Sequence, residues 1–154
     1  MNELLEIEKI KQLKARYFRA LDTNDWELFG STLAEDCVAR YSGGKYAFES
    51  RDATVAFMSQ NMSGPNFLSM HHGHHPEIDL SSDVTATGVW YLQDMVIDLN
   101  SNFRLYGAGI YADEYRKVDG HWQISKTGYE RTFECGETMG EGHVVMENMF
   151  ARQS

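Results

Sequence analysis

Four long β-strand candidates fill most of the second half of this 154-residue chain. They cover residues 68–80, 85–99, 103–118 and 122–133, and short polar turns join them. One of these turns, Asp119-Gly120, is typical of a tight hairpin. Strands of this length usually bend, and we expect the bends or bulges at Pro76, Gly107 and Gly109. The pattern therefore predicts a long, curved antiparallel meander.

The first half of the chain carries a helical pattern instead. Apolar residues recur at three- and four-residue steps from Leu4 to Leu21, which places them on one stripe of a helix. The expected elements are helices over residues 4–21, 26–33 and 51–62, and short strands over residues 38–41 and 46–48. Helices followed by a meander predict an α+β domain. A strongly bent sheet wrapped on helices can enclose a cavity, and this composition allows one.

Composition and charge argue against several classes of function. The net charge of −9 disfavours nucleic acid and anionic membranes as partners, since both need a basic face. No apolar run approaches the roughly 20 residues that span a bilayer, and the acidic N-terminus lacks the layout of a signal peptide. We therefore expect a cytoplasmic protein. Cys37 and Cys135 show no Cys-x-x-Cys spacing and offer no thiolate zinc site.

Four of the six histidines lie within residues 70–78. Such a cluster suggests proton transfer or metal binding, because histidine titrates near neutral pH. His72 and His74 are two apart, share a strand face and have the spacing of a two-histidine metal clamp. No third ligand follows from the spacing, so we predict no metal site. The alternative, solvated histidines or histidines bonded to the backbone, holds for at least two of the four.

Two aspartates and a tyrosine are further candidates for chemistry. Asp94 shares a strand face with Trp90 and other bulky apolar residues. If that face is buried, the carboxyl must be hydrogen-bonded, charge-paired or protonated; a strand end or bulge would leave it in water. Asp22 lies just past the apolar stripe of the first helix, where a turn role is the alternative. Tyr17, one turn earlier, is ordinarily a core residue whose hydroxyl finds one partner.

Several of these features follow one another in the order of a known family. They are Tyr17 and Asp22 at the end of the first helix, His71 opening a strand, Asp94 on the next strand, and the segment Tyr-Arg-Lys-Val-Asp-Gly-His-Trp-Gln-Ile at residues 115–124. Together they resemble the SnoaL-like branch of the NTF2-like superfamily, nearest to the bile-acid 7α-dehydratases, scytalone dehydratase and lindane dehydrochlorinase. The resemblance runs from about Leu4 to Phe133.

The resemblance implies a conical, cystatin-like barrel in which N-terminal helices pack on a strongly bent antiparallel sheet around a pocket. It also implies a homodimer or a homotrimer. The family domain would span residues 1–135. Residues 136–154 would form a tail, with a short helix at residues 144–150, that covers the pocket or a subunit interface.

By the same resemblance, His71 is the proton-transferring histidine and Asp22 is the aspartate that orients it. Tyr17 and Asp94 match a catalytic tyrosine and a second aspartate. Tyr41 falls near another pocket tyrosine of the family, and the large aromatic residues Phe67, Trp90 and Tyr106 are expected to bind substrate with it. The implied reaction is an elimination, or a related proton transfer, on a small hydrophobic carbonyl or polycyclic compound, with no metal or organic cofactor. Tyr17 or Tyr41 would hold the enolate oxygen, and a protonated Asp94 would donate to the leaving group.

The departures from the family pattern narrow the chemistry. Thr127 aligns with a basic pocket residue of the dehydrochlorinase, which disfavours halide elimination. Asp94 stands in the stretch where scytalone dehydratase carries a second histidine. His75 is expected at the edge of the pocket, with His72 and His74 on the other face. Because the family also holds isomerases, cyclases and non-catalytic members, the alternative is an isomerase or cyclase, or a non-catalytic small-molecule-binding protein.

Overall fold

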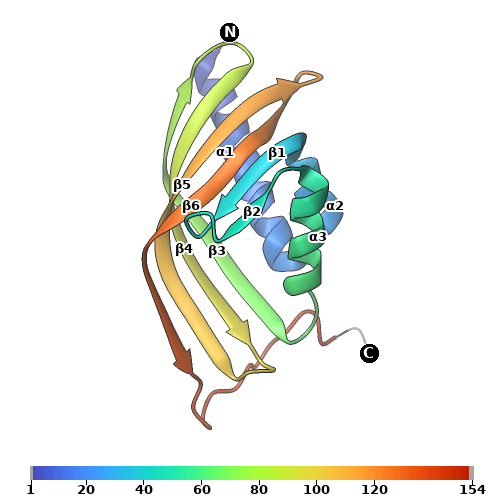
Figure 1. The fold of residues 1–154 in the computed structure, drawn as a ribbon, viewed down its shortest axis with the longest axis vertical. Coiled ribbons are helices and arrows are strands. Elements are labelled where there is room, and N and C mark those ends of the chain that lie inside the picture. Colours follow the sequence, from blue (N-terminus) through green and yellow to red (C-terminus); the bar gives the residue numbers. More distant parts are fainter. Residues whose placement is uncertain (1, 153–154) are drawn as a thin grey trace.

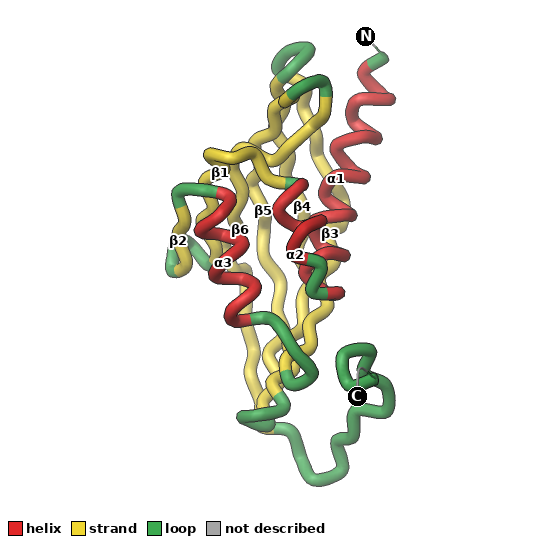
Figure 2. Tube along the Cα trace, turned by 90° about the vertical axis from the view of Figure 1, so that its right-hand side faces the viewer, coloured by secondary structure: helices red, strands yellow, loops and turns green. Residues whose placement is uncertain are grey.

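Three helices lie against one side of a curved six-stranded sheet (Figures 1 and 2). The structure is a computed structural model, which describes residues 2–152. The helices are α1 (Glu3–Thr23), α2 (Trp26–Ser31) and α3 (Arg51–Asn61). The strands are β1 (Leu33–Tyr41), β2 (Tyr46–Phe48), β3 (Phe67–Leu80), β4 (Thr85–Asp98), β5 (Phe103–Val118) and β6 (His121–Thr138). The predicted α+β class is confirmed.

Helix α1 begins and ends where local chemistry dictates. The Asn2 side chain caps its first turn by accepting from the Leu5 amide, and Glu3 and Glu6 lie at the positive end of the helix dipole. The helix stops at Asn24, whose left-handed backbone (φ 56°) closes the last turn. The predicted apolar stripe is buried against the sheet from Ile10 onward, whereas Leu4 at its start is exposed. Asp22, in the last turn, is thereby held beside β3.

The strands follow the order β2-β1-β6-β5-β4-β3, and the sheet does not close into a barrel. All pairs are antiparallel except β1 with β6, which run parallel. The hairpin turn between β5 and β6 has positive φ at both Asp119 and Gly120, as its sequence predicts. The meander β3–β6 supplies one wall of the molecule, and the helices cover its concave side (Figure 1).

Two of the three predicted bend sites coincide with bulges. The pairing of β3 with β4 shifts between His74 and Glu77, around Pro76. The pairing of β5 with β6 shifts between Ala108 and Gly109. At Gly107 the pairing stays regular, but an added Cβ would lie 2.6 Å from the Phe133 carbonyl oxygen. Each bulge bends the sheet and changes which side chains face the helices.

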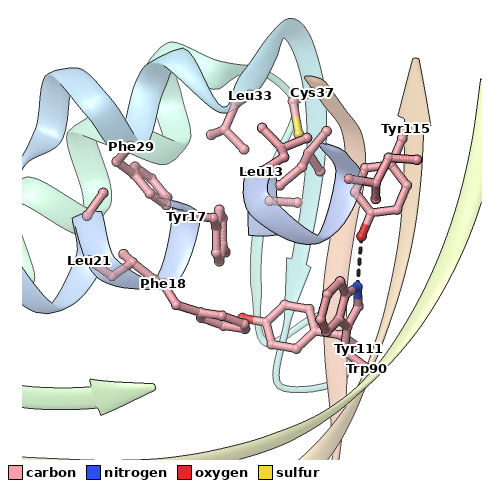
Figure 3. Packing of buried hydrophobic residues seen from close by; sticks show 14 of the residues in the cluster. Leu13, Tyr17, Phe18, Leu21, Phe29, Leu33, Cys37, Trp90, Tyr111 and Tyr115 are labelled. Atoms are coloured by element: carbon pink, nitrogen blue, oxygen red, sulfur yellow. Dashed lines mark hydrogen bonds between the residues drawn. The ribbon is translucent and has the colours of Figure 1, made fainter. Parts of the chain in front are cut away.

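The apolar core lies between α1, α2 and the sheet (Figure 3). Tyr17, Phe18 and Leu21 point from α1 toward Phe29 and Tyr111 (Figure 3). Trp90 lies deep in this core and donates its indole N–H to the Tyr115 hydroxyl, 2.9 Å away. Beside this core lies a cavity whose lining includes Val96 of β4, Leu105 of β5 and Glu134 of β6.

The C-terminal segment departs from expectation. Strand β6 continues to Thr138, across the domain boundary predicted at residue 135. The predicted helix at residues 144–150 is wrong, since residues 139–152 run irregularly beneath the sheet (Figure 1). Asn148 anchors this tail by donating to the Pro65 carbonyl oxygen, 2.8 Å away. None of the helices within residues 2–152 has the length and apolarity that a membrane crossing requires.

Candidate active site

Asp22 and His71 meet at the junction of α1 and β3. The His71 Nδ1 atom lies 2.7 Å from one oxygen of Asp22, and the His71 backbone N–H donates to the other oxygen at 2.9 Å. The Ser69 hydroxyl donates to Asp22 as well, at 2.9 Å. Three contacts therefore fix the carboxylate, and two of them come from His71 itself. The histidine predicted from the sequence does meet the predicted aspartate.

The contact with Asp22 determines how the His71 imidazole can act. Nδ1 carries its proton toward the carboxylate, so Nε2 is left as the basic nitrogen. The Phe18 ring stacks almost parallel to the imidazole, with 8° between the planes and 6.1 Å between the centroids. The His71 side chain is 11% exposed. The ring is thus fixed in plane and in tautomer while one edge remains accessible.

His71 lines a cavity of about 560 Å³. Its wall is largely aromatic and aliphatic, with a small polar group at one end. The lining residues are Tyr17, Leu21, Tyr41, Ser42, Lys45, Tyr46, Phe57, Met58, Met62, Phe67, His71, Asp94, Val96, Leu105, Tyr111, Tyr129, Arg131 and Glu134. A cavity of this size and composition suits a small, mainly apolar molecule.

Four tyrosines from α1, β1, β5 and β6 gather at the polar end. The hydroxyls of Tyr17 and Tyr41 lie 2.7 Å apart, and the Tyr111 and Tyr129 rings pack with 5.1 Å between centroids. Burial raises the pKa of each of the four phenols above its ordinary value. They therefore stay protonated near neutral pH and can act as hydrogen-bond donors.

Asp94 also faces the cavity, but as half of an ion pair. The Arg131 guanidinium donates to both Asp94 oxygens, at 2.5 and 2.8 Å, and its Nε lies 2.9 Å from Glu134. Burial lowers the pKa of Arg131, yet the hydrogen bonds with Asp94 outweigh it and hold that pKa above its usual value. A buried Asp94 was expected to be hydrogen-bonded, charge-paired or protonated, and its geometry is that of a charge pair. This geometry does not fit the predicted role of Asp94 as a protonated donor to the leaving group.

The remaining predicted residues divide between the cavity and other places. Phe67 and Tyr41 line the cavity. Trp90 does not: its indole lies in the core, bonded to Tyr115, behind His71. Tyr106 does not either: it pairs in register with Met95, on the outer face of the sheet, and is 39% exposed. The reason is alternation along the strands, since Asp94 faces inward and its neighbour Met95 must face outward.

The other histidines of the cluster lie away from the cavity. His72 and His74 point outward, as predicted, with 5.4 Å between their ring centroids. His75, predicted at the pocket edge, lies instead on the outer face, because the bulge gives it a left-handed backbone (φ 49°). Within residues 2–152 no three His, Cys, Asp or Glu side chains converge as a metal ligand set.

Among the cavity residues that were not predicted from the sequence are Tyr111, Tyr129 and Arg131. Tyr111 lies opposite Tyr129 in the β5–β6 pairing, and Arg131 lies two residues further along β6. The hairpin turn at Asp119-Gly120 would give their approximate pairing. The face on which they lie depends on the register shift between Glu114 and Tyr115, where no bulge was predicted.

Comparison with known proteins gives the family and the fold. The family model for a SnoaL-like domain matches residues 2–128. A scytalone dehydratase-like protein from Novosphingobium aromaticivorans DSM 12444 superposes with a TM-score of 0.80 and 21% identity, over 93% of this chain and 97% of that one. A hexachlorocyclohexane dehydrochlorinase from Novosphingobium barchaimii LL02 gives 0.78 and 17%, over 94% and 97%.

A third structure, a protein with a cystatin-like fold from Nostoc punctiforme, gives a TM-score of 0.66 and 22% identity, over 82% of this chain and 91% of that one. These likenesses confirm the predicted cystatin-like architecture. At such identities they speak for the fold alone.

Proposed function

The chain belongs to the SnoaL-like family, and from this premise we propose that it is a cofactor-independent lyase of the dehydratase type. Its substrate would be a small hydrophobic carbonyl or polycyclic compound held in the 560 Å³ cavity. The observation that carries the proposal is the 2.7 Å contact between Asp22 and His71 at the cavity wall. A carboxylate–imidazole pair has little use in a purely apolar binding site.

The proposed reaction begins with His71. Its Nε2 takes a proton from the carbon next to the substrate carbonyl, while Asp22 holds the Nδ1 proton and stabilises the imidazolium, as in a Ser-His-Asp system without the serine. A proton transfer positioned in this way is typically worth about 10²–10⁴-fold in rate. The electron pair of the broken C–H bond moves onto the carbonyl oxygen and forms an enolate.

The tyrosines would stabilise that enolate by hydrogen bonding to its oxygen. In the Tyr17–Tyr41 pair one hydroxyl donates to the other, and the hydroxyl whose proton stays free donates to the oxygen on which charge develops. Collapse of the enolate expels the hydroxyl on the neighbouring carbon, and the proton on His71 passes to it, so that water leaves. Asp94, bound by Arg131, is not assigned the proton-donor role; it orients the guanidinium at the cavity wall.

The test is proton exchange at carbon, which can be followed whatever the product of the reaction is. A panel of apolar ketones with and without a β-hydroxyl group is incubated with the protein in D₂O, and loss of the α-proton signal is followed by NMR. We expect His71→Ala and Asp22→Asn to lower the exchange rate by about 10²-fold or more. The matched control is His74→Ala, a histidine of the same strand that faces outward. Full exchange in both site variants would refute the Asp22–His71 assignment.

The same experiment separates the alternatives. A shifted double bond without loss of water would indicate an isomerase, and a new ring would indicate a cyclase. Saturable binding of the ketones without any exchange would indicate a non-catalytic small-molecule-binding protein.

We also propose that the protein is a homodimer or homotrimer. Support comes from large apolar side chains exposed on the outer face of the sheet, where they line a hollow of about 480 Å³. They are Met70, Tyr91, Tyr106 and Phe133, and the half-buried Met95 lines the same hollow. Within the described part of the tail, residues 136–152 line none of the cavity. Of the two roles expected for the tail, we therefore favour the subunit interface.

A further inference from the structure

A lysine and an aspartate are completely buried behind the tyrosine cluster. Lys14 Nζ lies 2.7 Å from Asp113, and both side chains are 0% exposed. Asp113 also accepts hydrogen bonds from Tyr115 and Thr127, each at 2.7 Å. Neither member of the pair lines the cavity. The proposed reaction gives the pair no role.

The ammonium of Lys14 is surrounded by aromatic rings. Its Nζ lies 3.7 Å from the centroid of the Tyr111 ring, 4.5 Å from that of Tyr17 and 5.0 Å from that of Phe18. Among the described residues no acceptor meets Nζ in directed hydrogen-bond geometry, so the Asp113 contact is a charge contact. Away from Asp113, the ammonium lies against these three rings.

Stability is a weak explanation for this arrangement. Removing two charges from water is costly, and well-packed apolar residues of similar volume often stabilise a core as much as a buried ion pair does. The surrounding cluster already contains Leu13, Leu33 and Ile124, which could enclose such residues. The placement of the cation over two phenol rings, both of which line the cavity, points to an electrostatic effect on those phenols.

We propose that Lys14 is a positioning residue that strengthens the hydroxyls of Tyr17 and Tyr111 as donors to an oxyanion in the cavity. A cation on the face of an aromatic ring is held by the electron density of that ring. It draws this density away from the phenol oxygen and makes the O–H group a stronger donor. Lys14 touches no substrate and acts through the two rings. The inference rests on the proposed function, because it presumes that an oxyanion forms beside the tyrosines.

The test compares an anionic probe with a neutral probe of the same shape. 4-Nitrophenol, whose ionised form is measured by its visible absorbance, mimics an enolate; 4-nitrotoluene carries a methyl group in place of the hydroxyl. We expect the wild type to prefer nitrophenolate over nitrotoluene. In the double variant Lys14→Met/Asp113→Asn, which leaves no buried charge unpaired, we expect this preference to fall about tenfold. Binding of nitrotoluene should stay unchanged, whereas a merely structural role would weaken both probes.

Two controls make every outcome decisive. Tyr17→Phe should lower the preference as well, and His74→Ala, which changes an outward-facing histidine, should retain it. If Tyr17→Phe loses the preference and the double variant keeps it, the inference about Lys14 is wrong while the oxyanion role of the tyrosines stands. If the wild type shows no preference, both that role and the inference fail.

A measurement on the wild type covers the case in which the double variant does not fold. The ¹⁵N chemical shift of Lys14 Nζ distinguishes an ammonium from a neutral amine. The proposal requires an ammonium at pH 7, held by the Asp113 carboxylate 2.7 Å away, although burial lowers the pKa of Lys14. A neutral amine would overturn the proposal.

Discussion

At the scale of single residues, Glu6 shows how one side chain ties a helix to a distant hairpin. It lies in the first turn of α1 and accepts from the Trp122 indole at 2.7 Å and from Lys117 and Lys9 at 2.8 Å. Hydrogen bonds from Lys117, then Lys9 and Trp122, lower the pKa of Glu6 from 4.5 to about 2. Trp122, which follows the hairpin turn in the sequence, thus connects the hairpin to helix α1 through its hydrogen bond to Glu6.

This contact predicts a pH dependence of stability. Since the pKa is lower in the folded state, the contribution of Glu6 is fully present above pH 4.5 and is lost as the pH falls through about 2. In Glu6→Gln the melting temperature should lie below that of the wild type at pH 7, and the difference should shrink between pH 4.5 and 2. Thermal unfolding followed by circular dichroism measures both. Glu8→Gln, which changes an exposed carboxylate of the same helix, is the control; a pH-independent difference for Glu6→Gln would contradict the prediction.

The residues of the candidate site show which single positions could be predicted from the sequence and which could not. The resemblance implied that Asp22 and His71 act together, and their side chains do meet. Their catalytic roles stay a prediction. Trp90 and Tyr106 were expected in the pocket because they are large and aromatic, a property that fits a core or an outer face equally well. Arg131 was missed because nothing in its local sequence tells an inward arginine from a solvated one.

At the scale of elements, the bulge in β3 determines which histidine faces the cavity. Ile78 pairs with Gly88, and continuing this pairing without a bulge would place His72 opposite Asp94. In the structure His75 and Pro76 together lie opposite Trp90. As a result His71, and not His72, lies opposite Asp94. A slip of one residue in register turns every side chain to the other face. The single extra residue is therefore what brings His71 to Asp22.

Deleting one or two residues of this bulge tests whether it determines the face on which His71 lies. Deleting His75 removes the extra residue and leaves a regular strand in which His71 still faces inward. Deleting His74 and His75 together removes one residue too many and should turn His71 outward. We expect the downfield Nδ1 proton resonance of His71, and the ketone exchange, to survive the first deletion and to vanish in the second. Equal behaviour of the two deletions would show that the bulge does not set the face.

The β5–β6 hairpin follows the same rule. Near the turn Tyr115 pairs with Ile124, and extending this register would place Tyr111 opposite Gly128. A bulge shifts the pairing by one, so that Tyr111 lies opposite Tyr129. Tyr129 and Arg131 thereby face the cavity, whereas simple alternation from Ile124 would place both on the outer face. The turn residues could be predicted from the sequence. Which β6 side chains face inward beyond the bulge could not.

At the scale of the whole molecule, curvature gives the sheet two different faces. The concave face holds the helices, the core and the cavity, while the outer face of β3–β6 exposes Tyr91 at 46% and Phe133 at 53%. Exposed apolar side chains that gather around one hollow are typical of surfaces that bind another protein. A second copy of this chain is the proposed occupant.

Light scattering coupled to size-exclusion chromatography tests this proposal. The wild type should elute with the mass of a dimer or a trimer, and Tyr91→Lys/Phe133→Lys should elute as a monomer, because two charges cannot be buried unpaired in an apolar interface. Leu4→Lys is the matched control, since Leu4 is an apolar residue of α1 that is 78% exposed. A monomeric wild type, or an unchanged mass in the double variant, would contradict the proposal.

By itself the sequence determined the order of the elements as far as β6 and the class of fold, but not the structure of the tail. Periodicity, caps and turn residues act between near neighbours and survive in any tertiary setting, so α1, the hairpin at Asp119-Gly120 and the long strands lie where the sequence predicts. Only the tertiary structure decided which faces of β3 and β6 look inward. Strand alternation is local, but a bulge is settled by how the partner strand pairs, and it reverses the face of everything beyond it. The candidate site depends on two such reversals, one for His71 and one for Arg131.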